Sequence, residues 1–495
     1  MNVGLACLVV TALAALAVSA WSGTRQAELE QWSLGGRRLG SGLVFLLLAG
    51  EIYTTFALLG GSGLAYSSGG AALYVLAYTP LAYVVSYWLL PVIWRYAKAT
   101  GSISQSDFFT RKYRSSALGV IVTVVGVTAM VPYLALQLKG MSIIASETSF
   151  GGIGRTPAVL LGGLLLATYV VLGGMRGAAL NAVIKDILIL LVVLALVLYL
   201  PHHYFGSVHD MFRAVQVRDP GHATLRERTG TGESWFVSTV LITSVGFFMW
   251  PHLFTASFTA RAEGVFRRNA VLLPMYNLVL LFAVIIGFTA FAHRPGLPKA
   301  AQDLALLNLA RDGLPHWAVG LVGAAGLLTG LVPGAVLATT TGSLLARNVY
   351  RPLRPDTDER RLTTVARIAV VAVIGIAMLL VFHGGTTLTN LLLVGYTYIV
   401  QLLPALLASL APRNPLEKWG AGAGMLTGLA IGSAFAFGGV TSADLAHWLP
   451  VEVAQLNSGV FALAGNLIVA FAGSALVRRA GNRSTTPDEA LAAAD

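Results

Sequence analysis

The residues best placed to do chemistry lie in an apolar stretch from Leu46 to Gly70, LLLAGEIYTTFALLGGSGLAYSSGG. It is apolar enough to span a bilayer, yet Gly50, the ionisable Glu51 and later glycines interrupt it. An ionisable side chain at that depth costs at least about 2.5 kcal/mol to insert, so it normally faces a cavity or a partner. A helix that opens at Gly50–Tyr53 would free carbonyls for a cation, and the next half-helix would attract an anion. The stretch predicts a transport site.

A carboxylate bound at such a site needs helix N-terminal amides, hydroxyl groups or a neutralising donor. The half-helix after the break supplies Tyr53, Thr54 and Thr55. A second interrupted segment, SVGFFMWPHLFTASF, places Trp250 and His252 on either side of a proline. We predict that these five residues bind the substrate. The alternative is that Trp250 is ordinary packing and that His252 is a core histidine with its hydrogen bonds satisfied.

The composition identifies a polytopic membrane protein. The 495 residues are 56% hydrophobic and 11% charged, with a mean hydropathy of +0.73, whereas soluble domains are roughly 25% charged. The net charge of +11 comes in short basic clusters between apolar runs, which is typical of membrane topology and not of nucleic-acid binding. The single cysteine, Cys7, excludes a disulfide framework and a cysteine-based metal site.

Apolar runs of about 20 residues predict thirteen membrane-spanning helices, with both termini on opposite sides. The runs are 2–21, 42–65, 71–96, 116–146, 156–175, 178–201, 234–259, 269–293, 315–346, 363–383, 387–411, 417–438 and 457–478. With the N-terminus outside, 24 of the 33 Lys and Arg residues fall on the inner side. Because basic loops stay inside, we expect a multi-pass protein of the cell (plasma or inner) membrane with its C-terminus in the cytoplasm. The first run lacks the basic start of a signal peptide and is expected to be retained.

Two interrupted spans at corresponding places in two halves indicate a midplane binding site between inverted repeats. Gly246 and Pro251 interrupt the seventh run as the glycines interrupt the second. The expected organisation is a first helix at 1–21, a repeat at 42–201, an outer loop at 202–233, a second repeat at 234–411, two spans at 417–478 and a disordered cytoplasmic tail at 479–495.

Several stretches together resemble the sodium:solute symporter family. They are EQWSLGGRRLG, GSGLAYSSGG, SQSDFFTRKY, GGMRGAALNAVIKD, WPHLFTASF and LLARNVYRPL, in family order. The resemblance implies an all-α fold like that of the leucine transporter, with a five-plus-five inverted repeat, an extra N-terminal helix and breaks in the second and seventh spans. PYLALQLKGMSII, RGAALNAVIKDILILL, RRNAVLLPMYNL and LVPGAVLATTTGSLLARNVY look most like its monocarboxylate permease subgroup, which takes up lactate, pyruvate, acetate or similar acids.

The resemblance also implies a sodium site, on carbonyls that fall at Gly50 and Tyr53 and on three ninth-span oxygens. The ninth-span carbonyl falls on Thr329, but the two hydroxyl positions are Val332 and Pro333, which have no side-chain oxygen. Oxygen ligands suit a hard cation, so Gly50, Tyr53 and Thr329 are the candidate Na⁺ ligands.

The missing hydroxyls make proton coupling the competing hypothesis, with Glu51 or Asp186 as the carrier. Burial in an apolar cavity favours the protonated form of a carboxylate, so such a group can load and release a proton as the cavity alternates. Asp186 could instead pair with Lys185 or Arg176 and only fix the orientation of its helix. Lys139, in the fourth span, is a further cation near the predicted site, and Ala256 stands where the family often has an arginine.

The sequence predicts a cation-coupled secondary transporter that imports small monocarboxylates, with Na⁺ or H⁺ as coupling ion. No P-loop and no nucleophile triad is present, so neither an enzyme nor a cofactor is expected. The expected partners are the carboxylate and the bilayer, without nucleic acid or an obligate protein. Two alternatives are a symporter for an amino acid, a sugar or a pantothenate-like acid, and a transporter-like sensor that has lost transport.

Overall fold

The computed structural model describes residues 2–23, 28–34, 50, 53–226, 230–258, 260, 262–383 and 385–480. Over these ranges the chain is helical, and its one β-type pairing is an isolated bridge between Arg226 and Thr231. Ten of the described helical segments are long and apolar enough to cross a membrane, or eleven when a bent pair is counted as one span. The all-α membrane fold expected from the composition is confirmed.

Two of the ten segments are too long for one crossing, which takes about 20 residues. One runs for 45 residues from Phe56 to Thr100, and the other is α8 (Arg155–Phe205), with 51 residues. Gly174 kinks α8 with φ 52° and ψ −149°, a conformation that only glycine adopts readily. Counting each long segment as two crossings gives the thirteen predicted spans, a number that stays a prediction.

The remaining elements follow one another with short connections. In chain order they are α1 (Val3–Gly23), α2 (Leu29–Leu34), η2 (Phe56–Gly60), α4 (Gly61–Ser68), η3 (Gly69–Leu73), α5 (Tyr74–Thr100), α6 (Gln105–Tyr113), α7 (Ser116–Thr148), α9 (Val208–Arg218), α10 (Glu233–Gly246), η5 (Phe247–Met249), α11 (Pro251–Ser257), α12 (Gly264–Tyr276), α13 (Val279–His293), η6 (Lys299–Leu304), α14 (Ala305–Gly313), α15 (His316–Leu344), η7 (Leu345–Tyr350), α16 (Arg351–Leu353), α17 (Glu359–His383), α18 (Leu388–Ile399), η8 (Val400–Leu402), α19 (Leu403–Leu410), α20 (Lys418–Phe437), α21 (Ser442–Leu445), α22 (Val451–Ala454) and α23 (Ser458–Arg479).

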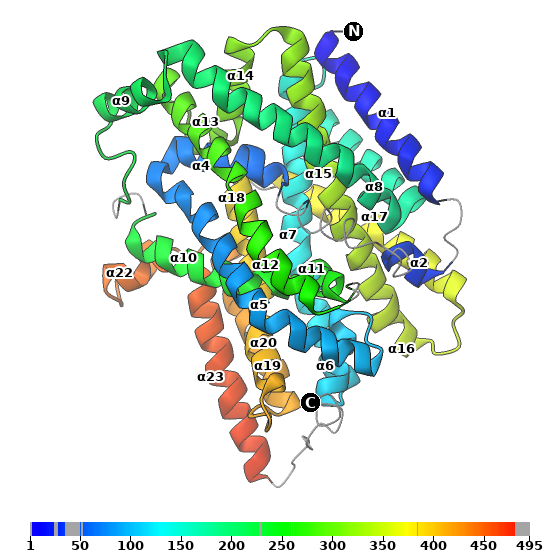
Figure 1. Cartoon of the computed structure of the whole chain (residues 1–495). Coiled ribbons are helices and arrows are strands. Elements are labelled where there is room, and N and C mark those ends of the chain that lie inside the picture. The colour runs from blue at the N-terminus through cyan, green and yellow to red at the C-terminus, as the bar shows by residue number, and fades with distance from the viewer. Residues whose placement is uncertain are drawn as a thin grey trace.

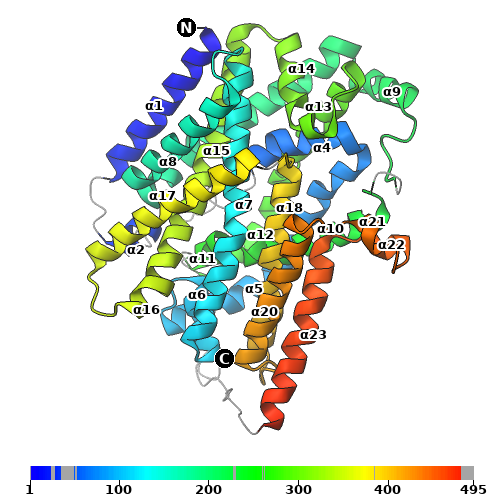
Figure 2. The same cartoon turned by 180° about the vertical axis from the view of Figure 1, so that it is seen from behind.

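Helix α7 runs through the middle of the bundle, and α15 packs between α7 and α8 (Figures 1 and 2). The span that contains α15 is 94% buried over its most apolar window, so it is a core element and has little contact with lipid. Helices α20 and α23 form a packed pair at one edge. The start of α1 and the end of α23 lie at opposite ends of the molecule in both views. We refer below to the α14 end and the α6 end, at the top and bottom of Figure 1.

The seventh predicted span is broken where the sequence indicated. Helix α10 ends at Gly246, a short 3₁₀ turn follows, and α11 begins at Pro251 with a bend of 54°. Trp250 at the bend has φ −57° and ψ 127°, which is outside the helical region. Proline suits the first position of α11 because that position needs no N–H donor. The predicted interruption at Gly246 and Pro251 is therefore confirmed.

The second predicted span opens at Tyr53 and Thr54, which form a bend before a π-helical turn and α4. Its half before Gly50 lies outside the described residues. Gly63 in α4 lies against the backbone of η6, because a Cβ there would stand 2.8 Å from the carbonyl oxygen of Gln302. A glycine is thus required where the broken span contacts the segment before α14.

The predicted outer loop at 202–233 is partly helical, and its His222 fastens it to α4. The His222 ring nitrogen Nε2 lies 3.0 Å from the carbonyl oxygen of Ala65, and the ring stacks on Phe291 with centroids 3.6 Å apart. The backbone N–H of Gly70 donates to the His222 carbonyl at 3.0 Å. Burial lowers the pKa of His222 below its usual 6.5, against the opposing effects of the Ala65 hydrogen bond and the nearby Asp219 carboxylate.

We predict that acidification loosens this loop. Because the folded-state pKa of His222 is lowered, its stabilising contribution is fully present above about pH 6.5 and is lost as the pH falls below that value. Hydrogen exchange at the amide of Gly70 should therefore accelerate between pH 7.5 and 5.5, after correction for intrinsic exchange. His222→Gln should show little additional change with pH, and His383→Gln, at an exposed site, should behave like the wild type. An equal response in wild type and His222→Gln would contradict the prediction.

Candidate functional site

A small enclosed cavity lies between the two broken spans. The residues that line it come from the bend at 53–54, from α5, α7, α10–α11 and α18. They are Thr54, Phe56, Tyr78, Tyr133, Phe247, Trp250, His252, Leu253, Leu392 and Tyr396. The space open to the centre of a water molecule is about 20 Å³, which is room for about one water. The site is closed in this conformation.

Three of the five predicted substrate residues line this cavity, namely Thr54, Trp250 and His252. The indole of Trp250 is fully buried, with its ring centroid 4.9 Å from that of Tyr133 and 5.4 Å from that of Tyr396. A Cβ at Gly395 would lie 2.6 Å from the indole, so the glycine makes space for it. Trp250 is thus a packing residue and a wall of the cavity at the same time.

The other two predicted substrate residues point away from this cavity. The Tyr53 hydroxyl donates to the carbonyl of Tyr276, and the ring borders a separate space of about 10 Å³ against α8 and α13. The Thr55 hydroxyl donates to Oε1 of Gln137 in α7 at 2.9 Å. Neither hydroxyl is directed at a solute in the cavity, and Thr55 instead joins the broken span to α7.

Three of the predicted coupling-ion residues meet at one point beside the break. The carbonyls of Gly50 and Tyr53 both accept hydrogen bonds from Nζ of Lys185, the Tyr53 bond at 3.3 Å. Nζ of Lys185 also lies 3.1 Å from Oδ1 of Asp186. Both charged side chains are buried, with exposures of 0% and 3%. The alternative considered for Asp186, an ion pair with Lys185, is the arrangement observed.

The remaining predicted ion residues are not part of this contact. Thr329 is buried in α15, and its hydroxyl donates to the carbonyl of Gly326 in the same helix at 2.6 Å. Glu51 lies outside the described residues. Within the described part of the chain, no group of three His, Cys, Asp or Glu side chains could hold a metal ion. A cation there would therefore depend on backbone carbonyls, one carboxylate and Lys185.

An ion-pair cluster lies toward the α14 end. Nζ of Lys139 in α7 lies 3.2 Å from Oδ2 of Asp303 in η6, and it donates to the carbonyl of Thr386. The same Asp303 oxygen accepts the N–H of Leu388 at 3.0 Å, at the start of α18. Lys139 is therefore held by a buried carboxylate and joins three elements.

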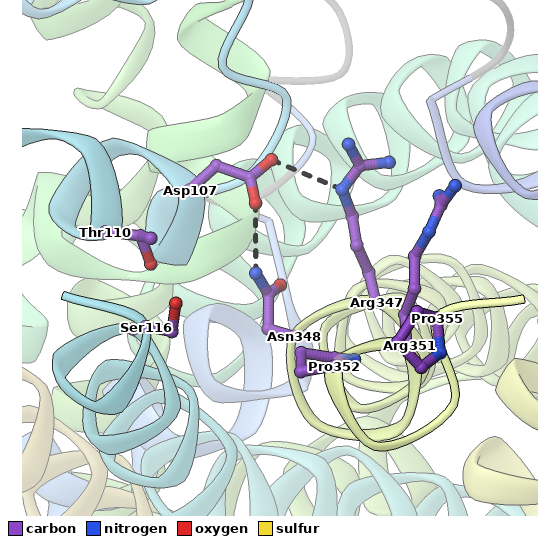
Figure 3. Close-up of a pocket in the computed structure, with 9 residues that line it drawn as sticks. Asp107, Thr110, Ser116, Arg347, Asn348, Arg351, Pro352 and Pro355 are labelled. Carbon is purple, nitrogen blue, oxygen red and sulfur yellow. Dashed lines mark hydrogen bonds and ion pairs between the residues drawn. The ribbon is translucent and has the colours of Figure 1, made fainter. Parts of the chain in front are cut away.

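A second cluster closes the α6 end, where two sequence motifs meet. Asp107 of SQSDFFTRKY lies 3.3 Å from Nε of Arg347 and accepts the side-chain N–H of Asn348 at 3.0 Å, both in LLARNVYRPL (Figure 3). These side chains border a surface depression of about 420 Å³. The motifs thus connect α6 to η7.

Sequence reasoning missed two glutamines that serve the broken spans. Nε2 of Gln105 in α6 donates to the carbonyl of Met249 at 2.7 Å, directly before the second break. Oε1 of Gln137 receives the Thr55 hydroxyl at the first break. The one signal was an amide side chain inside an otherwise apolar or motif-bearing segment, which does not show which carbonyl it reaches.

The comparisons with known proteins agree with one another on family and fold. A family model described as the sodium:solute symporter family matches residues 32–428. An uncharacterized symporter of Bacillus subtilis, YhjB, is 47% identical over 94% of each chain. A monocarboxylate transport permease protein of Rhizobium johnstonii is 30% identical over 91% of each chain.

Two solved structures show the same fold at low sequence identity. A Na⁺-coupled sialic acid symporter, in a substrate-bound outward-open state, superposes with a TM-score of 0.75 at 14% identity, covering 98% of this chain and 99% of the other. A nucleobase-cation-symport-1 family transporter in a closed conformation gives a TM-score of 0.51 at 11% identity, covering 90% and 95%. The expected leucine-transporter-like architecture is confirmed.

We predict that Asp107→Asn destabilises the protein by about 1–3 kcal/mol, because it removes the charge that holds Arg347 and one acceptor for Asn348. The measurement is the apparent Tm of purified protein in detergent. The control is Glu263→Gln, whose ion pair with Arg95 is exposed at both ends and should contribute well under 1 kcal/mol. Equal effects of the two substitutions would show that the α6-end cluster is an ordinary surface contact.

Proposed function

Because the chain belongs to the sodium:solute symporter family, we propose that it is a cation-coupled symporter that imports small monocarboxylates across the cell membrane. The observation that carries the proposal is the enclosed cavity between the two broken spans, bordered by Thr54, Trp250 and His252. Broken helices that face each other at mid-depth are where transporters of this architecture hold their solutes.

The chemistry of the cavity walls favours a small acid with a short apolar tail. Aromatic and aliphatic side chains form most of the lining, and the hydroxyl of Thr54 and the imidazole of His252 are among its few polar groups. A carboxylate can accept hydrogen bonds from such donors while its tail contacts Trp250. The relative from Rhizobium johnstonii, a monocarboxylate transport permease protein by name, supports the same substrate class.

The competing substrates fit these walls less well. A sugar presents many hydroxyl groups, each of which must keep a hydrogen-bond partner when it leaves water. An amino acid brings an ammonium group, and no carboxylate is among the described residues that line the cavity. The small volume of the closed site also favours a solute of a few heavy atoms.

The two ion-pair clusters supply closures on both sides of the cavity. Lys139 and Asp303 tie α7 to η6 and α18 at the α14 end, and Asp107 and Arg347 tie α6 to η7 at the α6 end. With the proposed orientation, N-terminus outside and C-terminus in the cytoplasm, the first cluster faces outward. Alternating access requires each cluster to open in turn, and bound solute with its cation would favour the closed arrangement.

We predict that the purified protein in proteoliposomes accumulates radiolabelled lactate, pyruvate or acetate, and that proline and galactose do not compete. Uptake is measured under an inward Na⁺ gradient and, separately, under an inward H⁺ gradient, the two coupling ions that the sequence allows. Competition by proline or galactose, without competition by pyruvate, would contradict the substrate assignment. Absence of uptake for every solute would instead support the transport-deficient alternative.

We further predict that Thr54→Val and His252→Gln each raise the half-saturating lactate concentration by about 10-fold, because each removes or repositions a donor to a charged carboxylate. Thr289→Val is the matched control, since its buried hydroxyl donates only to the carbonyl of Ile285 in its own helix. A loss of maximal uptake in all three variants, with unchanged half-saturation, would indicate a folding effect and would count against a binding role.

A further inference from the structure

The ammonium of Lys185 sits where a free cation would be expected beside the first break. It donates to the carbonyls of Gly50 and Tyr53, and it lies 3.1 Å from the Asp186 carboxylate. An ammonium has three donors and no acceptor, and here three oxygens surround it. A buried charge is tolerated only when it is paired and hydrogen-bonded, and this side chain is completely buried.

The backbone is shaped to receive this side chain. A Cβ added to Gly50 would lie 3.0 Å from Nζ of Lys185 and 3.3 Å from Oδ2 of Asp186. Glycine therefore allows the chain to approach both charged groups closely. The site is built from a glycine, an opened helix and two consecutive charged residues on α8.

The oxygens present do not suit Na⁺ together with this lysine. Two like charges a few ångströms apart repel strongly in a medium of low polarity, so the ammonium and a metal ion cannot share the Gly50 and Tyr53 carbonyls. On α15, the side chains of Val332 and Pro333 carry no oxygen, and the hydroxyl of Thr329 donates to Gly326. The oxygens that Na⁺ would need are missing on one side and already bonded on the other.

We propose that the Lys185 ammonium is a tethered cation that takes the place of Na⁺ at this site, so that the protein neither binds nor requires Na⁺ there. This inference rests on the proposed symport function only for its consequence in transport. The contact itself is independent of the substrate. A coupling ion other than Na⁺ follows, and H⁺ is the one to be tested.

The first experiment needs no substrate. The apparent Tm of the purified protein is measured while NaCl replaces choline chloride at constant ionic strength. We expect no Na⁺-specific shift for the wild type. A saturable increase of Tm with Na⁺ in the wild type would overturn the proposal, whatever the variants do.

Variants at Lys185 test whether the side chain occupies a cation site. Lys185→Ala leaves the two carbonyls and the Asp186 carboxylate, a set of oxygens that suits a hard cation. We expect this variant to lose stability in choline and to regain part of it with Na⁺. Lys139→Ala is the matched control because it also removes a lysine beside a buried carboxylate. The same Na⁺ response in both variants, or a response in neither, would count against a cation site at Lys185.

A transport assay separates this inference from the proposed function. Wild-type proteoliposomes take up labelled lactate with either NaCl or choline chloride on both sides of the membrane, under an inward H⁺ gradient. We expect equal initial rates in the two salts. A rate at least about 10-fold higher in NaCl would overturn Na⁺ independence. Absence of lactate uptake in both salts would contradict the proposed substrate, while the Tm experiment would still decide the role of Lys185.

Discussion

The whole site depends on the need to satisfy backbone polar groups inside an apolar bundle. A continuous helix bonds its own carbonyls, whereas a broken one exposes several of them where no water is available. In this chain side chains from other helices bind those carbonyls. Lys185 of α8 takes Gly50 and Tyr53 at the first break, and Gln105 of α6 takes Met249 at the second. The breaks can therefore persist without lipid-facing cost, and each is tied to a particular neighbour.

Close backbone approach is what brings those neighbours within reach. A Cβ at Gly140 would lie 2.4 Å from Thr55, and one at Gly330 would lie 3.1 Å from the same side chain. The first broken span thus rests between α7 and α15 on glycine surfaces, and small residues are how helices pack tightly in membranes. On the opposite side, Gly395 receives the indole of Trp250. Both breaks are held by contacts that larger residues would prevent.

Sequence reasoning found the breaks and part of the cavity, and it did so for physical reasons. Gly246, Pro251 and the apolar runs are local signals, so the bend between α10 and α11 could be predicted. Side-chain direction at a break could not, because helical periodicity ends there. Tyr53 and Thr54 are neighbours, yet one contributes a carbonyl to Lys185 and the other a side chain to the cavity. The partner of Gly50 lies 135 residues away, and no local pattern carries that distance.

The neighbouring charges of Lys185 and Asp186 also bear on membrane voltage. Both charges are fixed on the same turn of α8 and offset each other, so the resting site adds little net charge to the moving part of the protein. A monocarboxylate that crossed with this site alone would carry one negative charge inward. Against an inside-negative potential that movement costs about 2.3 kcal/mol for every 100 mV. Uptake of an acid therefore becomes insensitive to voltage only when a mobile positive charge crosses with it, since a cation bonded to the helix cannot be delivered.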